Sequence, residues 1–479
     1  MKTILHNFRI VDEHTDMRGS VVVEDGLIQD VLPLDADCPG LALTDKLPNP
    51  GRPEAGLFIN GPGLLGSGNT SDVPILMPAL VDLHAHFRES VFSEKETRLP
   101  SEVRLPSEVL ESASLAAAAG GYGTVVCMAN TSPPVDSLEK ALALKERCDT
   151  LGLIDLYPVL SLTKNMEGRE LSGITALTPE NSALAVRMFS EDGKDVADDR
   201  LFLAAMTEAR RLGLPVSCHC DAGGPEAAAA RAAGESRAVW SRIEENNAVR
   251  RAIELGEKAG CHIHIAHVST RESVETISRA KKAAASPFIL TCEATPHHIA
   301  CTEADARALG DESRGRVNPP LREEADRWAL IGALWDGTID AIATDHAPHH
   351  AADKKKGAPG FTGLETAFSV CLTELVFGRP GSAGLPDLRR LSSLMSAAPA
   401  RILGLGGNGP PDQGRIARGR IAPGLRADLF AADTGAAGTV DPALFKSRGK
   451  NSPFAGWEFR GKILLTLHGG RIVFGGNCV

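Results

Sequence analysis

Short apolar runs alternate with amphipathic stretches through the middle of the chain. The apolar runs predict strands at residues 78–84, 124–130, 153–160, 183–189, 214–220, 261–267, 288–294 and 339–345. Between several of them, apolar residues recur at helical spacing, as in "DSLEKALALKERCDTLG" and "DDRLFLAAMTEARRLG". Eight strands that alternate with helices favour an α/β fold in which a parallel sheet closes into a (β/α)8 TIM-type barrel.

The two ends of the chain have a different pattern. Residues 1–75 contain alternating segments and then a Gly/Pro-rich passage, 39–70, which we expect to be loop. Residues 412–479 again contain short strand and turn patterns, such as "GKILLTLHGGRIVF". Neither end has enough apolar positions for a core of its own, so we expect the two ends to form one small β-sandwich-like domain. The barrel is then expected over residues 76–411.

A six-residue tandem copy, "RLPSEVRLPSEV" at residues 98–109, follows the first predicted barrel strand. Two units are too few for a repeat architecture. We therefore expect an inserted loop or an irregular helix start that borders the functional site.

The composition is that of an ordinary globular protein, with 43% hydrophobic and 23% charged residues among 479. The formal charge of -10 argues against nucleic acid or an anionic membrane surface as a partner. No apolar run approaches the length of a membrane span and no secretion signal precedes the first strand, so we expect a cytoplasmic protein. The ten cysteines include no CxxC pair, which favours buried thiols, although Cys218 and Cys220 could act as soft metal ligands.

The stretch "VDLHAHFRES" places His84, His86 and Arg88 at every second position of the first barrel strand. Side chains at this spacing share one face of a strand. Taken alone, the pattern is equally typical of exposed residues on an edge strand. In a parallel barrel, however, the functional groups gather at the carboxyl ends of the strands, where this stretch lies.

Four further predicted strands also end in a histidine or an acid. These residues are Glu191 with Asp192, His219, His267 and Asp345. Alternation along 261–267 turns His262 and His264 away from the face of His267, so we interpret these two as buried or helix-facing rings. Imidazole and carboxylate groups are the ligands of Zn, Mn or Co in hydrolytic sites, and six ligands with a bridging carboxylate would hold two ions.

Nine short motifs, in order, resemble those of the long bacterial type of dihydroorotase in the amidohydrolase superfamily. The motifs are "HAHFRE", "GGYGTVVCMANT", "FSEDG", "HC", "HVST", "TPHH", "RVNPPLR", "ATDHAPH" and "GLET", with a weaker echo in "KSRGKNSPFAGWEFRGKI". They extend over most of residues 76–405. The resemblance implies a hydrolase that opens, or in the biosynthetic direction closes, the cyclic amide linking N-carbamoyl-L-aspartate and L-dihydroorotate in pyrimidine (UMP) synthesis.

The resemblance also implies two divalent ions, with zinc expected, one held by His84, His86 and Asp345 and the other by His219 and His267. Relatives bridge the two ions with a carboxylated lysine or with the second acid of a motif like "FSEDG". Arg187 occupies the lysine position here, and a guanidinium cannot be carboxylated, so Asp192 is the expected bridge. Asp345 would take the proton of the attacking water and deliver it to the departing amide nitrogen.

By the same resemblance, Arg88, Asn130 and His349 hold the substrate carboxylate and Asn318 contacts the ring amide. Arg88 suits this role because a planar guanidinium pairs with a carboxylate through two parallel hydrogen bonds. Related hydantoinases and dihydropyrimidinases act on rings without that carboxylate and have no arginine at this position.

Two alternatives remain open. One is another cyclic amidohydrolase, a hydantoinase, dihydropyrimidinase or allantoinase, which is favoured if Arg88 points away from the site. The other is a non-catalytic scaffold for aspartate carbamoyltransferase, although such copies lose metal ligands and all six implied ligands are present here. The expected partner is the small-molecule substrate, with a homodimer or an association with aspartate carbamoyltransferase left open.

Overall fold

The computed structural model describes residues 2–34, 57–65, 73–89, 106–221, 224–283, 286–310, 313–378, 388–406 and 417–475. Within these residues, eight parallel strands occur, seven of them where the apolar runs predict them. The strands are β6 (Leu80–Ala85), β7 (Tyr122–Cys127), β8 (Asp155–Pro158), β9 (Phe189–Ser190), β10 (Val216–Cys218), β11 (His262–Ile265), β12 (Ile289–Ala294) and β13 (Ala341–Ile342).

Two parallel sheets close into one barrel. Strands β6, β7 and β8 form one sheet, and β9 to β13 form the other in chain order. A parallel bridge between Leu160 and Phe189 joins the sheets on one side, and a bridge between Ala85 and His346 joins them on the other. At the second junction the His86 backbone N–H donates to the His346 carbonyl at 2.8 Å. The predicted TIM-type barrel is therefore confirmed.

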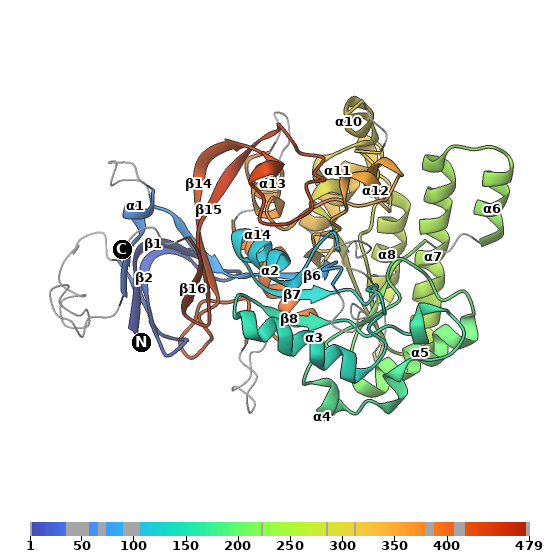
Figure 1. The fold of residues 1–479 in the computed structure, drawn as a ribbon, viewed down its shortest axis with the longest axis horizontal. Helices are drawn as coiled ribbons and strands as arrows, with labels where there is room; N and C mark the ends of the chain where they lie inside the picture. Colours follow the sequence, from blue (N-terminus) through green and yellow to red (C-terminus); the bar gives the residue numbers. More distant parts are fainter. Residues whose placement is uncertain are drawn as a thin grey trace, which may run out of the picture.

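Helices surround the barrel (Figure 1). They are α2 (Leu110–Ala119), α3 (Leu138–Leu151), α4 (Pro179–Ser182), α5 (Asp199–Leu212), α6 (Gly224–Ala232), α7 (Arg237–Ala259), α8 (Arg271–Ala283), α9 (Pro296–Ala300), α10 (Glu303–Ala308), α11 (Glu324–Asp336), α12 (Ala351–Lys355), α13 (Ala367–Cys371), α14 (Leu388–Ser392) and α15 (Ala398–Ile402). Helix α5 shows how the sequence determines where a helix begins, which face it buries and where it ends. Asp198 caps its first turn, Phe202 and Met206 are buried on one face, and Gly213 ends it with φ +68°.

The strand predicted at 183–189 is largely wrong, because β9 begins only at Phe189. The preceding residues turn out of α4 without pairing as a strand, and four of them, Ala185, Val186, Arg187 and Met188, are buried. A short apolar run has no alternation that would separate a buried loop from a buried strand.

The two ends of the chain pair into one sheet beside the barrel, as expected, and lie together at one side of the molecule (Figure 1). Its strands are β1 (Lys2–Val11), β2 (Asp16–Glu24), β3 (Leu27–Pro33), β4 (Leu57–Asn60), β5 (Ile75–Pro78), β14 (Leu429–Thr439), β15 (Glu458–His468) and β16 (Arg471–Gly475). Strand β5 links the two ends, since it pairs in parallel with β1 and antiparallel with β14. The exact division of the chain at residues 75 and 411 stays a prediction.

Two expected loops are only partly described. Inside 39–70, the structure contains β4, which pairs in parallel with β1, and the short helix α1 (Gly61–Leu64), so this passage is not all loop. In the tandem copy, residues 98–105 lie outside the described residues. Residues 106–109 lead into α2, and the Ser107 hydroxyl donates to the Pro348 carbonyl at 2.9 Å.

Separate hydrophobic cores fill the barrel and the terminal sheet. The eight cysteines in the described part of the chain are buried and form no disulfide bond, as the scattered pattern predicts. Within the described ranges, none of the helices has the length and apolar character that a membrane crossing requires.

Candidate metal centre

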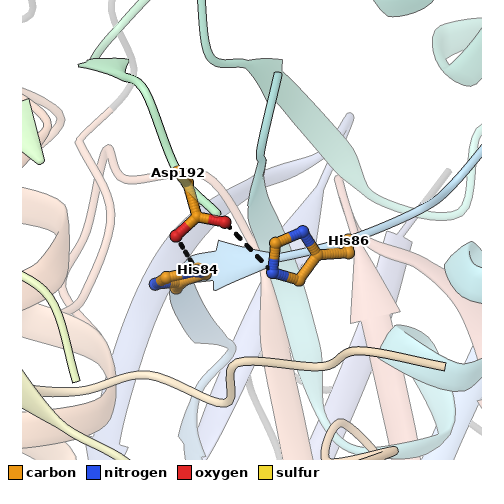
Figure 2. A group of neighbouring side chains, drawn as sticks. All are labelled: His84, His86 and Asp192. Carbon is orange, nitrogen blue, oxygen red and sulfur yellow. Dashed lines mark ion pairs between the residues drawn. The ribbon is translucent and has the colours of Figure 1, made fainter. Parts of the chain in front are cut away.

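Asp192 lies at the centre of a cluster of histidines at the carboxyl ends of the barrel strands. Its Oδ1 lies 3.2 Å from His84 Nε2 and 3.2 Å from His219 Nδ1, and its Oδ2 lies 3.5 Å from His86 Nε2. Figure 2 shows the rings of His84 and His86 on one side of this carboxylate. His267 Nε2 is 4.0 Å from Oδ1. The carboxylate is thus shared between a His84–His86 pair and a His219–His267 pair, each compact enough to hold a metal ion.

Asp345, after β13, completes the cluster on the side of the first pair. Its Oδ1 lies 3.2 Å from His86 Nε2 and 3.7 Å from His84 Nε2. The backbone of Asp345 has φ +46° and that of His267 has φ +34°, in the left-handed region that side-chain-bearing residues rarely adopt. Strained backbone conformations of this kind persist where the surrounding structure holds them in place, and they cluster at functional sites.

The other acid of "FSEDG" faces away from the cluster. Glu191 accepts hydrogen bonds from the backbone N–H groups of Leu162 and Thr163, both at 3.0 Å. Cys218 and Cys220 also take no part among the described residues, because their thiols donate to backbone carbonyls.

The charges of the cluster suit a cation. Burial opposes protonation of His84, but the carboxylates of Asp192, Glu293 and Asp345 together outweigh burial and raise the pKa of His84 well above its usual value. The histidines in turn hold the pKa of Asp192 well below its usual range, against the effect of burial. Nε2 of His84 and Oδ1 of Asp192 are buried without a hydrogen bond in the described chain. Buried polar atoms rarely lack partners, so these two orphaned atoms, 3.2 Å apart, fit a site built for a metal ion.

A second layer of groups holds the far nitrogens of the metal-facing rings. The contacts are His84 Nδ1 to Glu293 Oε1 at 3.0 Å, His86 Nδ1 to Asn130 Oδ1 at 2.9 Å, and His219 Nε2 to Asp221 Oδ2 at 3.0 Å. Each partner can accept the proton of its ring nitrogen and leave the opposite nitrogen free for a metal. The arrangement is the one that orients imidazole ligands in metalloenzymes.

Glu293, on β12, is a member of this layer that the sequence patterns do not identify. It is fully buried, and its second oxygen lies 3.0 Å from His264 Nε2. His264 in turn places Nδ1 2.9 Å from the Thr291 hydroxyl. His264 is therefore buried and away from the centre, as alternation predicts, yet it supports His84 through the shared carboxylate. The sequence does contain one indication of this role, an acid inside the apolar run 288–294. Buried carboxylates are rare unless they are paired, so such an acid predicts a buried partner.

Comparisons with known proteins agree with this geometry. The model of the amidohydrolase family matches residues 75–473. The chain is 34% identical over 474 residues to the dihydroorotase of Clostridium botulinum, covering 99% of this chain and 100% of the relative. It is 37% identical over 410 residues to the dihydroorotase of Bacillus caldolyticus, covering 84% and 87%.

The chain belongs to the amidohydrolase family.

The resemblance to dihydroorotases is thereby confirmed, and so is a metal-dependent cyclic amidohydrolase as the class of enzyme. Among solved structures, the L-hydantoinase of Arthrobacter aurescens has a TM-score of 0.77 at 24% identity, over 99% of this chain and 96% of that one. A D-hydantoinase has a TM-score of 0.75 at 20% identity, over 99% and 95%. At these identities the likeness shows the amidohydrolase fold alone.

Arg88 brings a positive charge to this amidohydrolase centre. Burial lowers the pKa of Arg88, while the carboxylates of Asp345 and Asp192 raise it, so the guanidinium lies within their field. Its Nε is buried and has no hydrogen-bond partner among the described residues. This nitrogen is therefore available to an anionic group from outside the chain.

Two amides expected to contact substrate, those of Asn130 and Asn318, also contact the metal-facing groups. Asn130 Nδ2 donates to Asp192 Oδ2 at 3.2 Å. Asn318 Nδ2 donates to Asp221 Oδ2 at 3.3 Å and lies 3.2 Å from His219 Nε2. Both residues are at the centre, but their side chains are already engaged with the protein.

His349 also lies beside Arg88, with its ring engaged. Its Nε2 is 2.7 Å from the Pro359 carbonyl, to which it donates. Burial, followed by the nearby charge of Arg88, lowers the pKa of His349 to about 4. The ring is therefore neutral at neutral pH, and its one proton is directed at Pro359.

Proposed function

We propose that this chain is a dihydroorotase, which reversibly hydrolyses the cyclic amide of L-dihydroorotate to N-carbamoyl-L-aspartate in pyrimidine biosynthesis. The dihydroorotases that it resembles over most of its length support the reaction. Arg88 carries the substrate assignment, because a guanidinium at the centre whose buried Nε has no partner among the described residues calls for an anion. The carboxylate of dihydroorotate is such an anion, and it fits the planar fork of an arginine.

In this proposal, the chain holds two zinc ions. His84, His86 and Asp345 bind one, His219 and His267 bind the other, and Asp192 lies between them. This donor set of imidazole nitrogens and carboxylate oxygens suits zinc. When bound, the ions polarise the amide carbonyl and lower the pKa of a water molecule so that it attacks near neutral pH.

Asp345 is the proposed proton carrier. It accepts the proton of the attacking water at Oδ1 and delivers it to the amide nitrogen as the ring opens. Although burial opposes ionisation, the neighbouring His86 and His84 keep the pKa of Asp345 well below its usual value. The carboxylate is therefore ionised at neutral pH, as a base must be, and the contact with His86 at 3.2 Å orients it.

Arg88 binds the substrate carboxylate and so fixes the ring over the centre. Asn130 and His349 are proposed to join it at the carboxylate, and Asn318 to contact the ring amide. Each of these side chains then gives up a protein partner when it binds the substrate. Asn130 gives up the Asp192 carboxylate, His349 the Pro359 carbonyl, and Asn318 the Asp221 carboxylate. A cytoplasmic location, a homodimer and an association with aspartate carbamoyltransferase stay predictions.

The variants Arg88→Ala and Arg88→Lys test this assignment on the metal-loaded protein. We expect dihydroorotate hydrolysis to fall by about 100-fold or more in the alanine variant, because the buried carboxylate of the substrate loses its charged partner. Lysine should restore only part of the rate, since it cannot make two parallel hydrogen bonds. Metal content should stay at the wild-type level.

Two outcomes would contradict the assignment. Wild-type protein that hydrolyses hydantoin or dihydrouracil in preference to dihydroorotate would make it another cyclic amidohydrolase. Wild-type protein that binds metal but turns over none of these rings would favour a scaffold.

A further inference from the structure

A cationic cavity of about 510 Å³ opens beside the metal centre. The side chains that give it its charge are Arg314, Lys354, Lys355, Arg448 and Lys450, and the rings of His349 and His350 also line it. Among the described residues that line it, none carries a carboxylate. The proposed hydrolysis does not use this cavity, which is called the cationic pocket below.

Three segments far apart in the sequence build the cationic pocket. They are residues 313–314, 349–355 with helix α12, and 448–455. The last belongs to "KSRGKNSPF", the motif that no proposed ligand or substrate contact explains.

Specific contacts fix this last segment against the barrel. Glu365 accepts the backbone N–H groups of Lys446 and Ser447 at 2.8 and 3.0 Å. Asn451 accepts from the His349 backbone N–H at 3.0 Å and donates to the Gly360 carbonyl at 2.9 Å. The Glu365 carboxylate is therefore occupied by backbone N–H groups. The side chains of Arg448 and Lys450 line the cationic pocket.

Several of these cations are not neutralised. Arg314, Lys355 and Arg448 are exposed, and no carboxylate in the described ranges forms an ion pair with them. The chain as a whole has a formal charge of -10, so this patch is opposite in sign to the molecule around it. A concave patch of one sign concentrates ligands of the other sign.

His349 brings the cationic pocket close to the proposed substrate site, since it follows Asp345 by four residues at the same rim of the barrel. That ring lines the cavity, and it is close enough to Arg88 for the guanidinium to lower its pKa. This neutral ring therefore lies near both the cations of the pocket and the guanidinium at the metal centre.

We infer that the cationic pocket is a docking vestibule for small dicarboxylate anions, which captures N-carbamoyl-L-aspartate before it reaches Arg88. This inference rests on the proposed function, since the open-chain compound carries two carboxylates and the cyclic one carries one. The vestibule increases the rate of encounter and the occupancy of the site, and it takes no part in bond making.

The double variant Lys355→Gln/Arg448→Gln tests the vestibule. The matched control is Lys258→Gln/Lys282→Gln, which removes the same charge from exposed positions in the last turns of α7 and α8. Those turns precede β11 and β12, so the control lysines lie at the opposite rim of the barrel.

Two readouts are measured on metal-loaded protein, each at low and at high salt. They are the steady-state kinetics of ring closure and the binding of N-carbamoyl-L-aspartate by calorimetry. For two cations roughly 10 Å from a dianion, we expect a loss of about five- to tenfold in kcat/KM and in affinity at ~0.01 M ionic strength. The loss should appear in KM rather than in kcat. It should vanish near ~1 M salt, where the Debye length is about 3 Å.

The outcomes separate the vestibule from the proposed function. Equal losses in the two double variants, or a loss that persists at high salt, would overturn the vestibule while leaving the activity in place. Wild-type protein that neither turns over nor binds N-carbamoyl-L-aspartate would overturn both.

Discussion

Glu293→Gln removes the negative charge behind His84 and leaves the shape of the side chain almost unchanged. In the structure the two Glu293 oxygens lie 3.0 Å from His84 Nδ1 and 3.0 Å from His264 Nε2. The amide oxygen of glutamine can still accept from one ring, whereas its NH2 group cannot accept from the other. We therefore expect His84 to keep its place and to become a weaker ligand.

The size of this effect follows from the geometry. One imidazole ring and one coordinate bond separate the carboxylate from an ion on His84, a distance of roughly 7 Å. At an effective dielectric of ~20, a unit charge at that distance interacts with a divalent ion by about 5 kcal/mol, which is an upper bound. The retained hydrogen bond and local relaxation reduce the loss, so we expect metal affinity to fall by about 10- to 100-fold, or ~1.4–2.7 kcal/mol.

Competition with a chromogenic chelator measures this affinity on purified protein, with Glu191→Gln as the matched control. Glu191 is also buried and also accepts hydrogen bonds, but its partners are the backbone N–H groups of Leu162 and Thr163 and the Thr163 hydroxyl, and not a histidine. The control should keep metal affinity within about threefold of wild type. Wild-type affinity in Glu293→Gln, or an equal loss in both variants, would refute the role of Glu293.

Three further predictions concern the centre itself. Asp345→Asn should lower kcat by about 100-fold or more with little change in KM, because an amide cannot carry the proton; steady-state kinetics that show a wild-type kcat would exclude this role. Because the pKa of His84 is raised in the metal-free protein, its proton must leave when metal binds near neutral pH, and calorimetry in buffers of different ionisation enthalpy should detect it. The protonated His84 also stabilises the metal-free fold. This stabilisation is complete below the ordinary histidine pKa of 6.5 and is lost as pH rises through the raised pKa of the folded state. The melting temperature of the metal-free protein should therefore fall from neutral to alkaline pH. Heats that do not depend on the buffer would contradict the proton release.

The sequence predicts the parts of the molecule that local patterns determine. Apolar periodicity locates the strands of the barrel, because each strand must bury its own side chains whatever its neighbours are. The period-two spacing of His84 and His86, at the end of β6, is likewise a local property, and the structure brings both rings to Asp192. The run 183–189 was misassigned because a buried loop and a buried strand have the same composition.

The groups that support the ligands could not be predicted in the same way. Glu293 and His84 are 209 positions apart in the sequence and meet only because β12 and β6 belong to one closed barrel. Asp221 is two residues from His219, yet its contact depends on how the chain turns after β10. Such contacts arise from tertiary packing, for which one sequence contains no periodic signal.

Anomalous X-ray scattering at the zinc edge, from crystals of the metal-loaded protein, tests the central claim most directly. We expect two peaks on either side of the Asp192 carboxylate, one bound by Nε2 of His84 and His86 and the other by Nδ1 of His219 and Nε2 of His267, at about 2.0–2.1 Å from each nitrogen. Zinc bound elsewhere, or a peak that contacts neither pair of histidines, would contradict the account.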